Sequence, residues 1–186
     1  MVVSTLETSR LVIREIEDAD ALAFHEYMQL EDYWRHIPMD PPTQESTAAR
    51  VRRWSLARSH EPRKDFYLAV TEKPCGKVVG EALLFVRSVE WRQGEIGWGL
   101  SADRAGRGLG TEIGAAMLRL AFGALNLHRV YAQCGVENFA SRRIMEKLGM
   151  REEGVLRENV FARGSWWSSV QCSILATEYV GQPPEK

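Results

Sequence analysis

The sequence predicts a mixed α/β fold in one domain, because runs with a strand-like repeat and runs with a helix-like repeat follow one another along the chain. Apolar residues alternate with polar ones in several short runs and recur every three or four positions in others. With 186 residues, of which 45% are hydrophobic, the chain can bury one large core and is short for two. We therefore expect residues 1–180 to form one domain and residues 181–186 to be a short tail.

The expected order is one strand, two helices, three strands, a helix, a strand, a helix and two strands. The seven strands are predicted at residues 11–13, 66–70, 78–86, 95–100 and 130–136, and in two runs within 155–180. The four helices are predicted at residues 18–29, 43–60, 108–123 and 138–149. Residues 33–42 are rich in proline and aromatic side chains, which predicts an irregular connector. Apolar Met150 after Gly149 predicts a Schellman end for the last helix.

The charge balance and the cysteines exclude several classes of function. The 24 basic and 25 acidic residues nearly cancel, so the composition indicates neither a nucleic-acid partner nor a membrane partner. No run has the length and apolar character of a membrane span or a secretory leader, and the cytoplasm is the expected location. Three widely spaced cysteines without nearby histidines predict reduced, mostly buried thiols and no metal site.

Three glycines alternate with Arg107 and Leu109 at a predicted junction between a strand and a helix. Glycine permits positive φ and a close approach of the backbone to a ligand, while the unpaired N–H groups of a helix N-terminus attract phosphate. A pyrophosphate site is therefore expected here, with additional charge from two arginines and a hydroxyl from a threonine. The residues of this expected site are Arg104, Gly106, Arg107, Gly108, Leu109, Gly110 and Thr111.

Other phosphate-binding motifs match this loop less well. The chain contains no Gly-Lys-Ser or Gly-Lys-Thr, which a P-loop requires. A dinucleotide site would need GxGxxG and an acidic residue about twenty positions later. The spacing here is GxGxG, and residues 125–130 contain no acid. The loop alone indicates a helix entrance that can bind a phosphate, and its sequence context must identify the ligand.

Four stretches in the same order agree with one known pattern: residues 8–14 (TSRLVIR), 95–98 (EIGW), 106–112 (GRGLGTE) and 138–141 (NFAS), the last ending in KLGM at 147–150. Together they resemble the GNAT superfamily of N-acetyltransferases, and within it the RimJ/RimL-like branch that acetylates ribosomal protein N-termini. The resemblance implies a single mixed, mostly antiparallel sheet of seven strands, flanked by about four helices and splayed between its central strands. Ala105 departs from the superfamily's loop, which has Gln or Arg at that place.

The resemblance also implies a function. It points to an acetyl-CoA-dependent N-acetyltransferase that modifies a primary amine, either a protein N-terminus or a small molecule, by direct attack in a ternary complex. The partners would be acetyl-CoA as co-substrate, without a metal, the amine acceptor, and a second copy of the chain in a possible homodimer. The alternative is a catalytically inactive acyl-CoA-binding regulatory protein of the same fold.

The same resemblance assigns roles around the acetyl group. Backbone N–H groups near Leu100 would hold the thioester carbonyl oxygen, and Leu100 and Ser101 are both expected to contact the cofactor. Glu95, on the glycine-rich face of its strand, is the expected general base, with Glu81 and Glu158 as alternatives.

Ser141 lies one helical turn after Asn138, and both would follow the CoA arm. The Ser141 hydroxyl would hydrogen-bond the departing sulfur, and the Asn138 side chain can in addition cap its helix.

The acceptor side is expected to involve aromatic residues and two positions that depart from the branch. Ser168 replaces an acidic residue that is common in the branch, and Cys172 replaces a tyrosine, which weakens the expectation of a ribosomal-protein substrate. The side chains expected to line the acceptor pocket are Tyr33, Trp34, His36 and Trp167.

Overall fold

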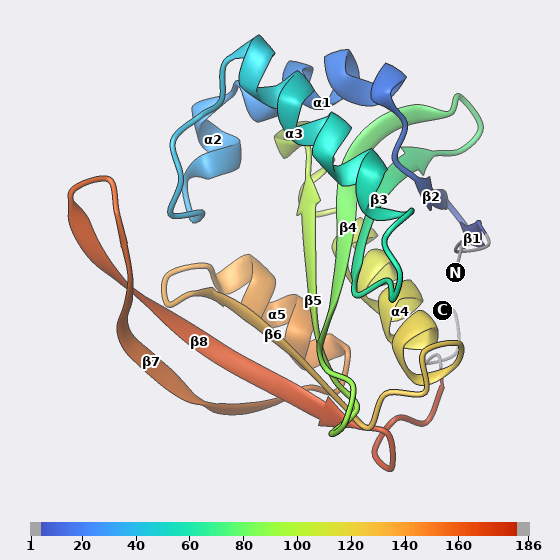
Figure 1. Cartoon of the computed structure of the whole chain (residues 1–186). Helices are drawn as coiled ribbons and strands as arrows, with labels where there is room; N and C mark the ends of the chain where they lie inside the picture. The colour runs from blue at the N-terminus through green and yellow to red at the C-terminus, as the bar shows by residue number, and fades with distance from the viewer. Residues whose placement is uncertain (1–4, 182–186) are drawn as a thin grey trace.

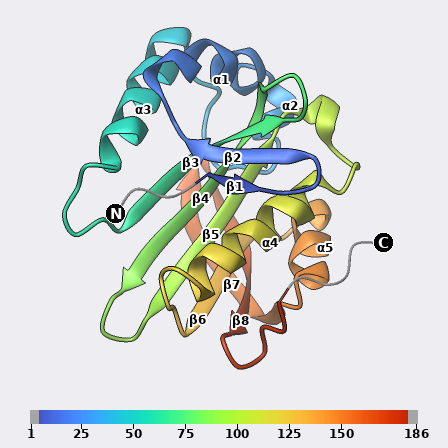
Figure 2. The same ribbon diagram turned by 90° about the vertical axis from the view of Figure 1, so that its right-hand side faces the viewer.

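The computed structural model describes residues 5–181, which form one mixed sheet covered by helices on both faces (Figures 1 and 2). The strands are β1 (Leu6–Glu7), β2 (Leu11–Glu15), β3 (Asp65–Glu72), β4 (Lys77–Ser88), β5 (Gln93–Leu100), β6 (Arg129–Gly135), β7 (Arg151–Ala162) and β8 (Ser165–Leu175). The helices are α1 (Ala21–Met28), α2 (Glu31–Trp34), α3 (Gln44–Ala57), α4 (Leu109–Phe122) and α5 (Phe139–Lys147), with 3₁₀ turns at Asp18–Asp20 and Ala102–Arg104.

The predicted fold class is confirmed, and two short elements were missed. The sheet of the described residues has eight strands in the order β1-β2-β3-β4-β5-β6-β8-β7. The additional strand β1 has two residues and pairs Leu6 with Ile13. The additional helix α2 lies in the predicted irregular connector, where it buries Trp34, whose indole N–H donates to the carbonyl of Met28. Of the predicted tail, residues 182–186 lie outside the described residues.

The sheet separates two cores. Helix α4 packs on β4 and β5 on one face, and its apolar stripe forms the larger core with the central strands. Helices α1 and α3 pack on β3 and β4 on the other face, around Phe24 and Trp34 (Figure 1). Thr43 caps α3 by accepting a hydrogen bond from the Ser46 N–H. Each face of the sheet is therefore covered by its own helix layer.

The two central strands separate after three paired residues. Strands β5 and β6 run parallel, and every other neighbouring pair in the described sheet is antiparallel. Their register covers Gln93↔Arg129, Gly94↔Val130 and Glu95↔Tyr131, after which the strands diverge (Figure 1). Backbone groups of β5 beyond Glu95 therefore face an opening instead of a neighbouring strand. This opening is the predicted splay.

Candidate active site

A cavity of about 420 Å³ lies around the glycine loop, and we call it the loop cavity. It brings together all of the predicted cofactor-binding residues except Ser101 and Arg107. Those that line it are Leu100, Arg104, Gly106, Gly108, Leu109, Gly110, Thr111, Asn138 and Ser141. The sequence therefore located one wall of a cavity from segments up to about forty positions apart.

The glycine loop ends at the N-terminus of α4. Gly106 and Gly108 have φ values of 75° and 79°, a backbone conformation that favours glycine. Gly108 is the N-cap and provides no side-chain cap for the first turn of the helix, so the first N–H groups of α4 have no partner within the helix. They supply hydrogen-bond donors and the positive end of the helix dipole to the loop cavity. Gly110 has a second role, because a Cβ there would overlap the Ile144 side chain of α5.

The two predicted loop arginines form ion pairs with Glu72 of β3. Glu72 accepts a hydrogen bond from Arg104 Nε at 2.8 Å and forms an ion pair with Arg107 at 3.3 Å. Arg104 still lines the cavity, whereas Arg107 does not. Two further cations, Arg143 and Lys147 of α5, line it and were missed. Their spacing of four residues is a helical signal that could have identified them.

Asn138 and Ser141 meet at the start of α5, as their spacing predicted. The Asn138 side-chain oxygen Oδ1 accepts a hydrogen bond from the Ser141 backbone N–H at 3.0 Å, which caps the helix. Within residues 5–181, the Ser141 hydroxyl has no hydrogen-bond partner. The helix ends in the predicted Schellman motif, since Gly149 has a φ of 77° and the Met150 N–H donates to the Met145 carbonyl at 3.0 Å.

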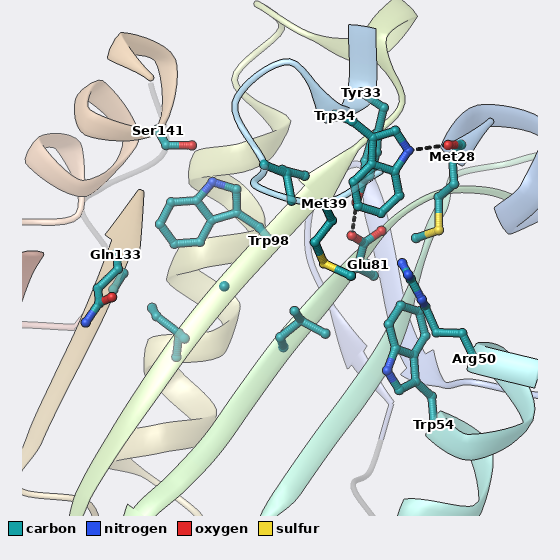
Figure 3. Close-up of a pocket in the computed structure, with 15 residues that line it drawn as sticks. Met28, Tyr33, Trp34, Met39, Arg50, Trp54, Glu81, Trp98, Gln133 and Ser141 are labelled. Atoms are coloured by element: carbon teal, nitrogen blue, oxygen red, sulfur yellow. Dashed lines mark hydrogen bonds between the residues drawn. The ribbon is translucent and has the colours of Figure 1, made fainter. Parts of the chain in front are cut away.

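A second cavity of about 220 Å³ fills the splay between β5 and β6, and we call it the splay cavity. Ile96 and Gly97 of β5 and Gln133 of β6 line it together with residues of the α1–α3 layer. Ser141, Trp98, Tyr33 and Ile37 line both cavities. Figure 3 shows Trp98 between Ser141 and Glu81. The two cavities therefore adjoin around Trp98, and a ligand of the loop cavity can reach a ligand of the splay cavity.

The backbone of β5 presents N–H groups to this junction. The Ser101 N–H donates to the Val79 carbonyl of β4 at 2.8 Å, so it is not available to a ligand. Because N–H groups alternate in direction along a strand, those of Leu100 and Trp98 point the other way, toward the splay. Among the amides near Leu100, the geometry therefore favours that of Leu100 itself over that of Ser101.

Glu81 is a buried carboxylate in the wall of the splay cavity. Its side chain comes from β4, the residue is 5% exposed, and its oxygens accept hydrogen bonds from Tyr27 Oη at 2.5 Å and from Tyr33 Oη. Burial raises the pKa of Glu81, and the two tyrosine hydrogen bonds and the nearby charge of Arg50 offset part of this rise. A carboxylate with a raised pKa in a cavity is a suitable proton acceptor.

Glu95 lies on the same face of the sheet as Glu81, but it lines neither the loop cavity nor the splay cavity. Its carboxylate accepts a hydrogen bond from Arg87 Nε at 2.8 Å and one from Tyr131 Oη at 3.2 Å. Glu158, the other alternative, is exposed in β7 and lines neither of these two cavities. Its N–H donates to the Ser168 hydroxyl at 2.9 Å. The geometry therefore favours Glu81 among the three carboxylates.

The predicted acceptor residues divide into two groups. Tyr33 and Trp34 line the splay cavity, and Tyr33 and His36 line the loop cavity. Trp167 lines neither, because its indole N–H donates to the Ala162 carbonyl at 3.0 Å across the β7–β8 turn. Cys172 is buried in β8, whereas Cys75 is exposed, which departs from the expectation of mostly buried thiols.

Among residues 5–181, no group of three or more potential metal ligands is placed to hold an ion. None of the helices formed by these residues is long and apolar enough to cross a membrane.

Comparison with known proteins agrees with this geometry. Residues 10–151 match the model of the acetyltransferase (GNAT) domain family. An uncharacterized N-acetyltransferase of Bacillus subtilis, YnaD, is 30% identical over 174 residues, which cover 94% of this chain and 98% of that protein. The [ribosomal protein uS5]-alanine N-acetyltransferase of Escherichia coli is 24% identical, covering 94% and 92% of the two chains.

A crystal structure of a GNAT-family acetyltransferase from Bacillus anthracis superposes with a TM-score of 0.82 at 30% identity, covering 94% of this chain and 100% of that one. The matched domain spans more than half of the chain, and the relatives include a ribosomal-protein N-acetyltransferase, in agreement with the predicted branch. The chain is an acetyltransferase and belongs to the GNAT family.

Proposed function

We propose that the protein transfers an acetyl group from acetyl-CoA to a primary amine, with both substrates bound at once. The observation that carries this proposal is the junction of the two cavities at Trp98 and Ser141. One cavity offers helix N–H groups and the side chains of Arg143 and Lys147, which suit the phosphates of CoA. The other ends at a buried carboxylate. A thioester at the junction would face an amine in the splay cavity.

In this proposal the neutral amine attacks the thioester carbonyl carbon, the C–N bond forms and the C–S bond breaks. The amine proton passes to Glu81, directly or through water, and the departing CoA sulfur gains a proton. The Leu100 N–H supports the carbonyl oxygen, a contribution of about 3 kcal/mol where one such donor was removed in another enzyme. The Ser141 hydroxyl hydrogen-bonds the sulfur, whose thiol pKa of about 8.5 makes it a tolerable leaving group.

Glu81 replaces Glu95 as the proposed base on the strength of its position, and Glu95 is kept as the second candidate. Tyr33 lines both cavities and donates to Glu81, so its hydroxyl lies between the base and the proposed thioester. A homodimer and a cytoplasmic location stay predictions.

The test is release of free thiol from acetyl-CoA with a panel of primary amines: amino acids, polyamines, aminoglycosides and N-terminal peptides. The proposal expects release with at least one class and an acetylated product of the matching mass. CoA binding without release for every acceptor would favour the inactive acyl-CoA-binding regulator, and absence of CoA binding would contradict both.

A further inference from the structure

Arg50 is a cation in the splay cavity that, among residues 5–181, pairs directly with no anion, although its charge acts on Glu81 from a longer distance. It lies on α3, is partly buried and lines the cavity together with Glu81 (Figure 3). Within residues 5–181 its guanidinium forms neither a hydrogen bond nor an ion pair, and Glu81 lies beyond ion-pair distance. A guanidinium has five N–H donors in a fixed plane, and those of Arg50 are not buried, so they are accessible to a ligand of the cavity.

Two tryptophans hold the guanidinium without using its donors. Its central carbon lies 5.3 Å from the ring centroid of Trp34 and 5.9 Å from that of Trp54. The Trp34 indole N–H is bound to the Met28 carbonyl, and Trp54 stacks on Tyr67 with centroids 5.3 Å apart. Both rings are therefore fixed by their own contacts. Ring faces stabilise the charge but accept none of the in-plane N–H groups, which stay directed at the cavity.

The remaining wall is apolar and the cavity is small. Met28, Met39, Leu83, Ile96 and Trp98 contribute to it. Its volume of about 220 Å³ is below the roughly 300–1,000 Å³ of sites for drug-sized ligands. An acceptor that fills it is a small molecule with an apolar part, and a polycation would meet the charge of Arg50.

We propose that the acceptor is a small amine that also carries an anionic group, a carboxylate or a phosphonate-type group, and that Arg50 binds this group while the amine faces Glu81. The planar guanidinium can bind either anion through two parallel N–H groups. This inference rests on the proposed acetyl transfer and narrows its acceptor from primary amines in general to amines of this class.

The experiment compares acceptors that differ only in the anion. Two series, built on methionine and on phenylalanine, contain the amino acid, its amide, its amine without the carboxyl group and its phosphonate analogue. Thiol release from acetyl-CoA is measured for the wild type, Arg50→Gln, Arg50→Lys and Arg52→Gln. Arg52 is exposed on the same helix and lines neither cavity, so its variant controls for loss of a positive charge on α3.

The quantity to compare is the ratio of the kcat/KM value for an anionic acceptor to that for its amide. The acid and the amide differ in the pKa of their amines, but this difference is the same for every enzyme variant and cancels when the ratios are compared. In the wild type the anionic acceptor is expected to react faster. Arg50→Gln is expected to lower that ratio by about ten- to a hundredfold, the range for a hydrogen bond to a charged group. Arg50→Lys should lower the ratio by a smaller factor, and Arg52→Gln should have the same ratio as the wild type.

A second readout does not depend on turnover. Calorimetric titration of the CoA-bound protein with N-acetylmethionine and with N-acetylmethioninamide should show tighter binding of the acid, a preference that Arg50→Gln abolishes. Equal use of acids and amides by the wild type, or a ratio unchanged in Arg50→Gln, would overturn the inference and leave the acetyltransferase proposal standing. Thiol release with no amine of any class would overturn the proposed function itself, and this inference with it.

Discussion

Glu81 and Gly99 lie opposite each other in the β4–β5 register, and the missing side chain of Gly99 leaves the space that the Glu81 carboxylate occupies. A Cβ at position 99 would overlap Glu81 Oε1 and Tyr33 Oη. The glycine-rich face of β5, which the alternation in its sequence predicted, therefore makes room for a carboxylate of the neighbouring strand.

Gly99→Ala is accordingly expected to displace Glu81 and Tyr33 and to lower kcat by about a hundredfold, the effect of a misplacement of about 1 Å in an active site. The control is Gly97→Ala in the same strand, where a Cβ would meet Leu83 at an ordinary 3.6 Å. Equal kcat losses in the two variants, measured by thiol release, would contradict this role of Gly99.

Gly110→Ala tests the packing of α4 on α5. The added Cβ would overlap Ile144 Cδ1, the end of a flexible side chain, and the gain in helix propensity offsets about 1 kcal/mol of the overpacking, so a net loss of about 0–2 kcal/mol of unfolding free energy is expected. Gly114→Ala, one turn further along α4, would overlap a terminal methyl group of Leu148 and is expected to change the unfolding free energy by a similarly small amount. Because Gly110 lines the loop cavity and Gly114 does not, weaker CoA binding is expected in Gly110→Ala alone. Denaturant unfolding measures the change in stability of both variants, and CoA titration measures their CoA affinities. Equal CoA affinities of the two variants would contradict the placement of Gly110 in the CoA site.

Lys147→Gln is expected to weaken CoA binding by about two- to fivefold at low salt, the range for an exposed charge pair. The difference from the wild type should shrink as the salt concentration rises, since exposed charges are screened. Arg142→Gln serves as the control, because Arg142 lies on the same helix but outside the loop cavity, paired with Glu152 at 3.0 Å. A loss in Arg142→Gln as large as in Lys147→Gln would argue against a specific contact.

Glu153 should stabilise the β6–β8–β7 part of the sheet in a pH-dependent way. Burial acts to raise its pKa, but hydrogen bonds from Ser173, Arg129 and Gln171 outweigh burial and lower the pKa to about 2. A lowered pKa means that the stabilisation is present above the ordinary value of about 4.3 and is lost as the pH falls toward 2.

Wild type and Glu153→Gln should therefore differ in unfolding free energy near neutral pH and converge in acid. Urea unfolding between pH 3 and pH 7 measures this difference, and the exposed Glu90→Gln provides the control. A difference in unfolding free energy that stays constant between pH 3 and pH 7 would contradict this role of Glu153.

The pH profile of the reaction should report Glu81. Burial raises its pKa above the ordinary range for glutamate, and Tyr27, Tyr33 and Arg50 are the ionisable groups that act on it. Since the base must be deprotonated, kcat is expected to fall as the pH is lowered through this raised value, which lies above that of an exposed carboxyl. Glu81→Gln should remove this step from the profile, and persistence of the step in the variant would assign it to another group.

The sequence predicted the framework and the donor side because those depend on local patterns. Period-two alternation placed the central strands, and glycines with an Asn-x-x-Ser spacing located two helix N-termini that line one cavity. Helix α2 was missed because four residues are too few for a periodic signal, and its position depends on the burial of Trp34.

The general base was harder to predict from the sequence, because its two candidate carboxylates project from the same face of the sheet. Glu95 and Glu81 differ in their neighbours, Arg87 for the first and two tyrosines of the α1–α2 region for the second. These contacts join residues far apart in sequence, and no local pattern contains them. Arg50 was missed for the same reason, since nothing in α3 itself indicates that it points at a cavity.

The most direct test of the account is steady-state thiol release from acetyl-CoA by the wild type, Glu81→Gln and Glu95→Gln with the best amine acceptor, after CoA titration has shown that all three bind CoA. If Glu81 is the base, Glu81→Gln lowers kcat by about a hundredfold or more, the range for loss of a general base, while Glu95→Gln stays within a few-fold of the wild type. Wild-type turnover by Glu81→Gln would contradict this role of Glu81, and a large loss confined to Glu95→Gln would assign the base to Glu95.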